Sequence, residues 1–156
     1  MPRCSACAWA RKLLAEAAGG RARRAPEPEI GWREVELEAQ AADPLFGYVP
    51  RRFAGFEWHS YEIEPPPGGV VLASSDCCLQ AFRAGVCSWG VQFHAEVTAE
   101  TLAEWIAKDG EQGELRGAGL DPCALGAETA RRIAGSGRLG ADLCRRFLAL
   151  AQRARS

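Results

Sequence analysis

The sequence predicts an α/β fold, an open mixed sheet flanked by helices that contains an antiparallel element. Segments with strand-like alternation and segments with helical spacing follow one another in mixed order. Gly and Pro residues separate several of the strand segments at the spacing of hairpins. The 156 residues are enough for one domain with an apolar core.

The first part of the chain is predicted to contain a helix, a connector and a strand. Residues 9–18 have helical composition, and Gly19-Gly20 is expected to end this helix as a C-cap pair. Residues 21–28 are basic and contain prolines, which favours a connector. Residues 31–38 alternate between apolar and charged side chains, as a half-exposed strand near a sheet edge does.

The middle of the chain is predicted to be a loop followed by short strands. Residues 39–55 read as a loop with one short helical turn at residues 43–46. Three prolines and two glycines make a rigid turn at residues 65–69. The expected strands around this turn are residues 56–60, 70–74, 79–83 and 87–93.

The last part of the chain is predicted to be helical. Thr98 is expected to be an N-cap, because apolar residues at helical spacing follow it. After a loop at residues 117–122, an amphipathic helix is expected over residues 126–152. Gly135 and Gly137 are expected to break this helix in two.

The order of the elements lacks a strand at its start. A parallel α/β sheet needs a central buried strand that leads into a helix, and no apolar strand precedes residues 9–18. We therefore expect the chain to correspond to the later two thirds of a domain.

Composition excludes some classes of partner. A formal net charge of −1 gives no electrostatic reason to expect nucleic acid or a membrane surface as partner, and no apolar run reaches the length of a membrane span. The seven cysteines have irregular spacing, which favours reduced thiols in the cytoplasm over a disulfide framework. Cys4-x-x-Cys7 has the spacing of a redox or zinc motif, but no second pair completes a tetrahedral site, so we expect no metal ion and no cofactor.

One stretch, residues 90–96, carries candidate chemistry. An apolar run ends in His94, and the carboxylate of Glu96 follows two residues later. A histidine oriented by a carboxylate is the basic part of a nucleophilic triad. The alternatives are a histidine that only packs at the end of a strand, and an acidic residue that favours the start of the helix behind Thr98.

Residues 90–96, Gly-Val-Gln-Phe-His-Ala-Glu, resemble the Gly-x-Gln-Phe-His-Pro-Glu signature of class I glutamine amidotransferases. Further segments resemble this family in the same order, above all its stand-alone members that are similar to GMP synthase. These segments are residues 26–32, 56–62, 65–67, 72–75 and 80–83. The resemblance extends over about residues 13–150 and implies a flavodoxin-like domain that lacks its first strands.

The resemblance implies a Cys-His-Glu triad that hydrolyses glutamine and supplies ammonia to an acceptor, in general a partner synthase. His94 would be the base and Glu96 would orient it. His59 would lie near the mouth of the active site, where substrate contact and simple packing beside Trp58 are equally open. Ala95 replaces the usual proline, which loosens the turn without removing a reacting group.

The N-terminus departs from the family pattern. The nucleophile of the family lies in a Gly-x-Cys-x-Gly turn, and residues 4–14 contain no glycine. Aligning the usual Leu-Leu pair with Leu13-Leu14 places Ala8 at the nucleophile position and leaves Cys7 one residue away. We therefore divide the chain into an atypical N-terminus, residues 1–12, and a partial amidotransferase domain, residues 13–152, and expect impaired or absent activity.

A frameshift is one hypothesis for this departure. One synonymous back-translation of residues 1–10, read from the third base, encodes Ala-Ala-Met-Leu-Gly-Val-Cys-Leu-Gly, an apolar strand followed by the expected turn. An unrelated N-terminal sequence is the alternative, and the upstream DNA distinguishes the two. Two other functions stay open for the chain, a non-catalytic scaffold or binding module and a γ-glutamyl hydrolase.

Overall fold

The computed structural model describes residues 5–38 and 42–153. The chain divides into two compact units, each of which is described by itself. The first unit consists of residues 1–39 and 51–94, and the second consists of residues 40–50 and 95–156.

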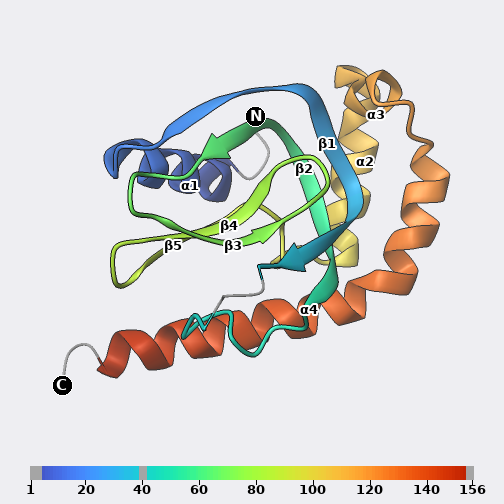
Figure 1. The fold of residues 1–156 in the computed structure, drawn as a ribbon. Helices are drawn as coiled ribbons and strands as arrows, with labels where there is room; N and C mark the ends of the chain where they lie inside the picture. The colour runs from blue at the N-terminus through green and yellow to red at the C-terminus, as the bar shows by residue number, and fades with distance from the viewer. Residues whose placement is uncertain (1–4, 39–41, 154–156) are drawn as a thin grey trace. The chain divides into compact units, whose positions relative to one another are not determined.

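The first unit is built on an antiparallel sheet with the strand order β2-β1-β3-β4-β5. Figure 1 shows β1 and β2 as its long, curled strands. The combination of this sheet with helices confirms the predicted α/β class. Each strand pairing among the described residues is antiparallel, so the parallel pairing of a mixed sheet is not found in this part of the chain. The strands are β1 (Arg21–Leu37), β2 (Arg52–Glu64), β3 (Val70–Ser74), β4 (Leu79–Ala84) and β5 (Ser88–Val91).

Strand β1 begins ten residues earlier than predicted, so the expected connector at residues 21–28 is wrong. Residues 21–24 pair with residues 61–64 of β2. The register shifts between Arg24 and Glu29, and both prolines of the segment lie in this interruption, where the ladder does not need their missing N–H groups. The partner strand β2 is distant in the sequence, so the local composition of residues 21–28 does not reveal that they form a strand.

Helix α1 (Ser5–Ala17) belongs to the same unit and packs on its sheet. Gly19 has a φ of +90°, and the Gly20 N–H donates to the Ala15 carbonyl over 2.8 Å, which confirms the predicted C-cap pair. Ala15 is fully buried in a cluster with Ile63, Phe82 and Ala84. The helix therefore contributes to the core of this unit.

The predicted turn at residues 65–69 is confirmed. Gly68 has a φ of +74°, and the Gly69 N–H donates to the Pro66 carbonyl over 2.8 Å. Strand β2 is longer than the predicted 56–60, and β5 ends at Val91 instead of residue 93. The sequence thus predicted where β2 and β5 lie, but not the residues at which these strands begin and end.

The second unit is helical, with α2 (Ala99–Gln112), α3 (Glu114–Gly117) and α4 (Pro122–Arg153). Thr98 is the N-cap of α2, as predicted, and its side chain accepts a hydrogen bond from the Thr101 N–H. The predicted turn near residue 43 is also present, since the Asp43 carboxylate accepts from the N–H groups of Leu45 and Phe46 at 2.8 and 3.1 Å.

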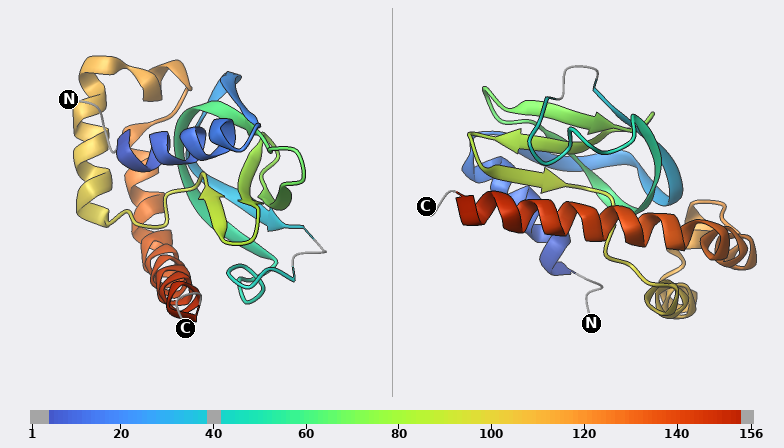
Figure 2. Two further views of the ribbon diagram at one scale, coloured as in Figure 1. Left: turned by 90° about the vertical axis from the view of Figure 1, so that its left-hand side faces the viewer. Right: turned by 90° about the horizontal axis from the view of Figure 1, so that it is seen from below.

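Helix α4 continues as one element through Gly135 and Gly137, so the expected break is wrong (Figure 2), and its ribbon bends along its length (Figure 1). A glycine costs a helix about 1 kcal/mol relative to alanine, which the neighbouring turns of a long amphipathic helix can offset. Among residues 5–38 and 42–153, no helix combines the length and the apolar character needed to cross a bilayer.

Candidate functional site

His94 lies at the end of the first unit, three residues after β5 ends. The Gln92 N–H donates to the Gln80 carbonyl and the His94 N–H donates to the Phe56 carbonyl, both over 2.7 Å. The backbone at His94 is therefore fixed to β2, and the residue is buried, with 4% of its surface exposed.

Glu96 belongs to the second unit, because the boundary between the units falls between His94 and Ala95. It is exposed, two residues before the N-cap of α2. The orientation of His94 by Glu96 stays a prediction from the sequence motif.

Cys7 lies in the first turns of α1, where residues 5–17 are helical. Its side chain is outside the described part of the structure, as is all of Cys4. Farther along α1, Arg11 Nη1 donates to the Gln92 carbonyl over 3.1 Å, and Lys12 Nζ lies 3.3 Å from the centre of the Tyr61 ring. The backbone at position 7 is thus helical and does not form the sharp turn that holds the nucleophile in the family pattern.

His59 is buried between two carboxylates. Its Nε2 lies 3.2 Å from Glu29 Oε2 and 3.2 Å from Glu57 Oε2, and the three side chains are at most 4% exposed. The β1–β2 register pairs Glu29 directly with His59, and Glu57 shares the face of β2 with His59 because side chains alternate along a strand. The predicted contact of His59 with substrate stays a prediction.

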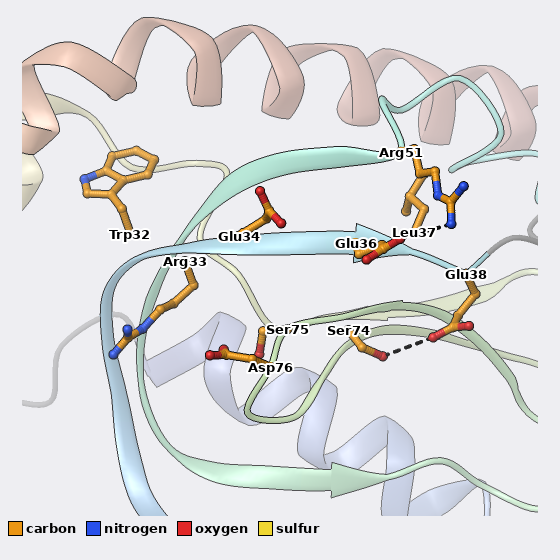
Figure 3. A pocket seen from close by; sticks show the side chains of 10 residues that line it. All are labelled: Trp32, Arg33, Glu34, Glu36, Leu37, Glu38, Arg51, Ser74, Ser75 and Asp76. Atoms are coloured by element: carbon orange, nitrogen blue, oxygen red, sulfur yellow. Dashed lines mark hydrogen bonds and ion pairs between the residues drawn. The ribbon is translucent and has the colours of Figure 1, made fainter.

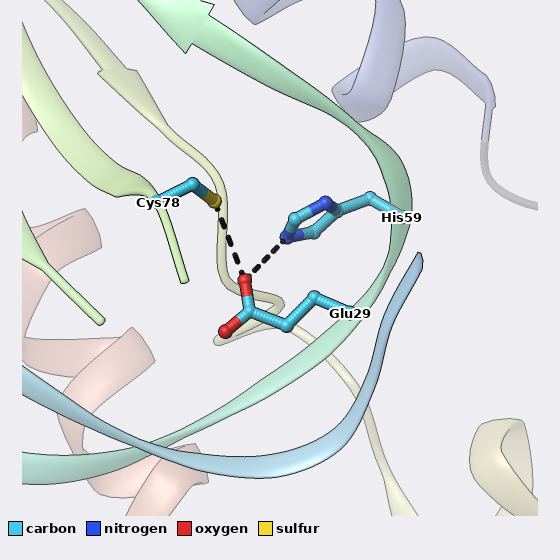
Figure 4. A group of neighbouring side chains, drawn as sticks. All are labelled: Glu29, His59 and Cys78. Carbon is cyan, nitrogen blue, oxygen red and sulfur yellow. Dashed lines mark hydrogen bonds and ion pairs between the residues drawn. The ribbon is translucent and has the colours of Figure 1, made fainter. Parts of the chain in front are cut away.

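Cys78, two glutamines and Ser75 complete this cluster. Figure 4 shows Cys78 and His59 both pointing at the Glu29 carboxylate. The Cys78 thiol donates to Glu29 Oε2 over 3.4 Å, and Gln80 Nε2 donates to the same oxygen over 2.8 Å. Gln92 Nε2 lies 3.1 Å from both ring nitrogens of His59.

Burial and charge shift the pKa values of these groups in different directions. Burial raises the pKa of Glu57 to about 7, against the opposing effect of His59. For Glu29, burial acts in the same direction, but hydrogen bonds from His59 and Ser75 outweigh it and leave the pKa below its usual value. Burial lowers the pKa of His59, and the contacts with Glu29 and Glu57 more than reverse this effect.

Cys78 is a weak nucleophile in this environment. Burial and the negative charge of Glu29 both raise the pKa of its thiol far above the usual value. The thiol is therefore protonated near neutral pH, and only the thiolate is reactive. The Cys78 thiol is therefore not suited to act as a nucleophile at neutral pH.

The sequence predicted only His59 among the members of this cluster. Glu57 could have been found, because a carboxylate two residues from a histidine in an apolar strand shares its face. Glu29 could not, since it lies between the expected connector at residues 21–28 and the expected strand at residues 31–38, and its pairing with His59 depends on the β1–β2 register. Cys78 and Gln80 come from yet another segment, which only the folded chain brings near.

A separate cavity of ≈ 700 Å³ opens along β1 and the turn after β3 (Figure 3). Its charged side chains are partly paired with each other, with Arg51 Nη2 at 3.1 Å from Glu36 Oε1. Ser75 connects this cavity with the cluster, because its Oγ accepts from Gln80 Nε2 over 3.2 Å. The lining residues are Trp32, Arg33, Glu34, Glu36, Leu37, Glu38, Arg51, Ser74, Ser75 and Asp76.

Comparisons with known proteins point to one family. The family model described as "Glutamine amidotransferase class-I" matches residues 11–110, a segment that contains His59, His94 and Glu96 and excludes Cys7. The chain is 36% identical over 83 residues to a GMP synthase [glutamine-hydrolyzing] of Thermosipho melanesiensis, covering 51% of this chain and 16% of that protein. It is also 36% identical over 99 residues to the protein of the same name from Thermomicrobium roseum, covering 63% and 18% of the two chains.

A solved structure supports the same assignment. A glutamine amidotransferase from Thermotoga maritima superposes with a TM-score of 0.77 at 29% identity, covering 88% of this chain and 58% of that one. The chain therefore spans less than a fifth of these curated relatives and about three fifths of this structural neighbour. Since the family model covers well over half of the residues, the chain belongs to the class I glutamine amidotransferase family.

Proposed function

We propose that this chain carries the base of a glutamine-hydrolysing site, with His94 as general base and Glu96 as the carboxylate that orients it. The observation that carries the proposal is the placement of His94. It is buried behind β5, and its backbone is held by the Phe56 carbonyl of β2. A base held this firmly is suited to proton transfer at a fixed position.

In the proposed reaction, a cysteine thiol gives its proton to His94 and the thiolate attacks the carboxamide carbon of glutamine. His94 then passes the proton to the departing nitrogen, so that ammonia leaves and a glutamyl thioester remains. Water hydrolyses the thioester to glutamate and restores the thiol. The ammonia goes to an acceptor, which for a domain similar to GMP synthases is the substrate of a synthase partner.

We further propose that this chain is impaired in that reaction. Residues 5–17 are helical, and neither glycine of the Gly-x-Cys-x-Gly turn is present. Without the turn, no backbone N–H groups beside the nucleophile stabilise the oxyanion. Loss of a triad nucleophile lowers rates by about 10⁴- to 10⁶-fold.

The same observations support a second candidate, a non-catalytic scaffold that keeps the glutamine pocket or the partner surface. The match to the family model begins at residue 11, after the nucleophile position. We also propose a cytoplasmic location, because the exposed Cys87, Cys123 and Cys144 are unpaired, as is usual in a reducing compartment.

Ammonia release from glutamine by the purified chain tests the proposal. We expect no release above that of His94→Asn, which removes the base. Cys7→Ala is the test variant for the nucleophile, and Cys87→Ser, an exposed cysteine of the same unit, is the matched control. Release that Cys7→Ala and His94→Asn abolish and Cys87→Ser retains would overturn the proposed impairment, and release unaffected by His94→Asn would overturn the role of His94.

Two further measurements separate the remaining functions. Glutamine binding by calorimetry without turnover would support the scaffold. Hydrolysis of γ-glutamyl peptides in preference to glutamine would favour a γ-glutamyl hydrolase instead.

A further inference from the structure

The buried cluster around His59 combines three kinds of metal-binding atom. Glu29 Oε2, His59 Nε2 and Cys78 Sγ come from β1, from β2 and from the turn before β4, and such donor atoms of the three residues lie within 4.8 Å of one another. Figure 4 shows the three side chains converging on one point. A carboxylate, an imidazole and a thiolate are the ligand types found in zinc sites.

The distances between these atoms suit a tetrahedral ion. Ligands at about 2.0–2.3 Å from a zinc ion are separated from each other by about 3.3–3.7 Å. Glu29 Oε2 lies 3.2 Å from His59 Nε2 and 3.4 Å from Cys78 Sγ. An ion could therefore enter with small side-chain adjustments.

The charge around His59 provides a second, independent observation. Glu29 and Glu57 are both buried carboxylates, with 2% and 0% of the side chain exposed, and they share a single imidazole. Among the described residues, Glu57 Oε1 and Glu29 Oε1 accept no hydrogen bond, and Glu57 Oε2 has only the ion-pair contact with His59 Nε2. Buried carboxylate oxygens without partners are costly, and a divalent cation between them would offset that cost.

We propose that Glu29, His59 and Cys78 bind a divalent transition-metal ion of the zinc type, with Glu57 as the fourth ligand. Glu57 Oε2 lies 3.2 Å from His59 Nε2, but it is not one of the three donor atoms that lie within 4.8 Å of one another, so its side chain has to move toward the ion. On binding, the ion displaces the proton of the Cys78 thiol, which is released to solvent. Mg²⁺ and Ca²⁺ are disfavoured, because both prefer sites made of oxygen atoms alone.

A site with four protein ligands is structural in character, since no position is left open for a reacting water. Among the described residues, strands β1 and β3 pair over a short stretch, through Glu36–Ser74 and Leu37–Ala73 and a hydrogen bond from the Glu38 N–H to the Leu72 carbonyl. An ion held by Glu29, His59 and Cys78 would replace the hydrogen bond between Cys78 and Glu29 with metal–ligand bonds that join the β1–β2 pair to the turn after β3. Ser75 lines the cavity in Figure 3, and its Oγ accepts a hydrogen bond from Gln80 Nε2 of the cluster.

Cobalt and zinc are the probes for this site. After removal of metal with a chelator, the full chain is titrated with Co²⁺ and the absorption of thiolate-to-cobalt charge transfer is followed in the near ultraviolet. We expect one equivalent of Co²⁺ to bind with this band, Zn²⁺ to displace it, and Cys78→Ser to abolish it. Cys87→Ser is the matched control and should keep the band, because Cys87 is an exposed thiol of the same unit.

A measurement on the unaltered chain avoids dependence on variants that fold poorly. Zn²⁺ should slow alkylation of Cys78 at least tenfold, as mapped by mass spectrometry, and leave Cys87 unchanged. Absence of the band, binding well below one equivalent, or protection of Cys4, Cys7 or Cys77 in place of Cys78 would overturn the proposal. None of these readouts uses glutamine, so the result is independent of the proposed function.

Discussion

At the residue scale, Gly90 shows why the signature of residues 90–96 begins with a glycine. Gly90 pairs with Phe82 across β4 and β5, and a Cβ built on Gly90 would overlap the Phe82 ring. Phe82 is itself 1% exposed and packs against α1 through the cluster with Ala15. The glycine therefore makes room for a core side chain four residues before His94.

We expect Gly90→Ala to lower the free energy of unfolding by about 1–3 kcal/mol, because the ring must move out of a packed core. Urea denaturation followed by tryptophan fluorescence measures this loss. The double variant Gly90→Ala/Phe82→Leu should lose less than the sum of the two single variants, since the smaller side chain removes the overlap. Additive losses would show that the ring is not what excludes the Cβ.

The buried cluster shows what local sequence could and could not supply at this scale. Glu57 and His59 share a strand face, which period-two alternation predicts. The pairing of Glu29 with His59 depends on a register set over the whole length of two strands, with a shift between Arg24 and Glu29. A register of this kind is fixed by tertiary pairing, and single-sequence patterns do not contain it.

At the scale of elements, the glycines of α4 differ in how closely other residues approach them, a difference that the sequence does not reveal. A Cβ at Gly137 would meet nothing within 4 Å, and one at Gly135 would make only an ordinary contact with Arg138. A Cβ at Gly140 would overlap the backbone oxygen of Ala95 within the same unit. Only Gly140 is therefore required by close packing.

We expect Gly135→Ala and Gly137→Ala each to raise the free energy of unfolding by up to about 1 kcal/mol, because alanine favours the helix. Gly140→Ala is the matched control in the same helix and should lower it by about 1–3 kcal/mol through overlap. Thermal unfolding followed by circular dichroism at 222 nm compares the three variants. Equal effects at Gly137 and Gly140 would contradict the packing role of Gly140.

Elements with local signals were predicted well, and elements held by distant partners were not. The Thr98 cap, the Gly19-Gly20 helix end and the turn at residues 65–69 each depend on a few neighbouring residues, and all three are confirmed. The first half of β1 was wrongly assigned because its prolines and arginines resemble a linker. In the folded chain, Pro26 and Pro28 lie where the β1–β2 pairing is interrupted. Arg23 Nε lies 2.9 Å from Glu62 Oε1 on β2.

At the scale of the whole molecule, the chain combines a recognisable family framework with an unusual start. The segment that matches the family model contains the predicted base and its carboxylate, and it begins after the nucleophile position. The family could be predicted from the sequence because several motifs keep their order. The catalytic state could not, because it depends on whether residues near position 8 form a turn that holds a cysteine.

Restoring that turn tests whether the rest of the framework is competent. The variant Ala6→Gly/Ala8→Cys/Ala10→Gly places the family pattern in register with Leu13-Leu14. The two glycines each cost α1 about 1 kcal/mol of helix stability, which favours unwinding of its first turns toward an elbow. We expect ammonia release from glutamine at least tenfold above the parent chain, and its loss when His94→Asn is added.

The control variant Ala6→Gly/Ala8→Ser/Ala10→Gly keeps the glycines and replaces the thiol with a hydroxyl, which is a far weaker nucleophile without further activation. It should stay at the level of the parent chain. If the cysteine variant also stays at that level while its circular dichroism shows an intact fold, then the missing turn is not what limits the chain. In that case the domain around His94 would be a non-catalytic scaffold, because His94 would not activate the thiol introduced at position 8.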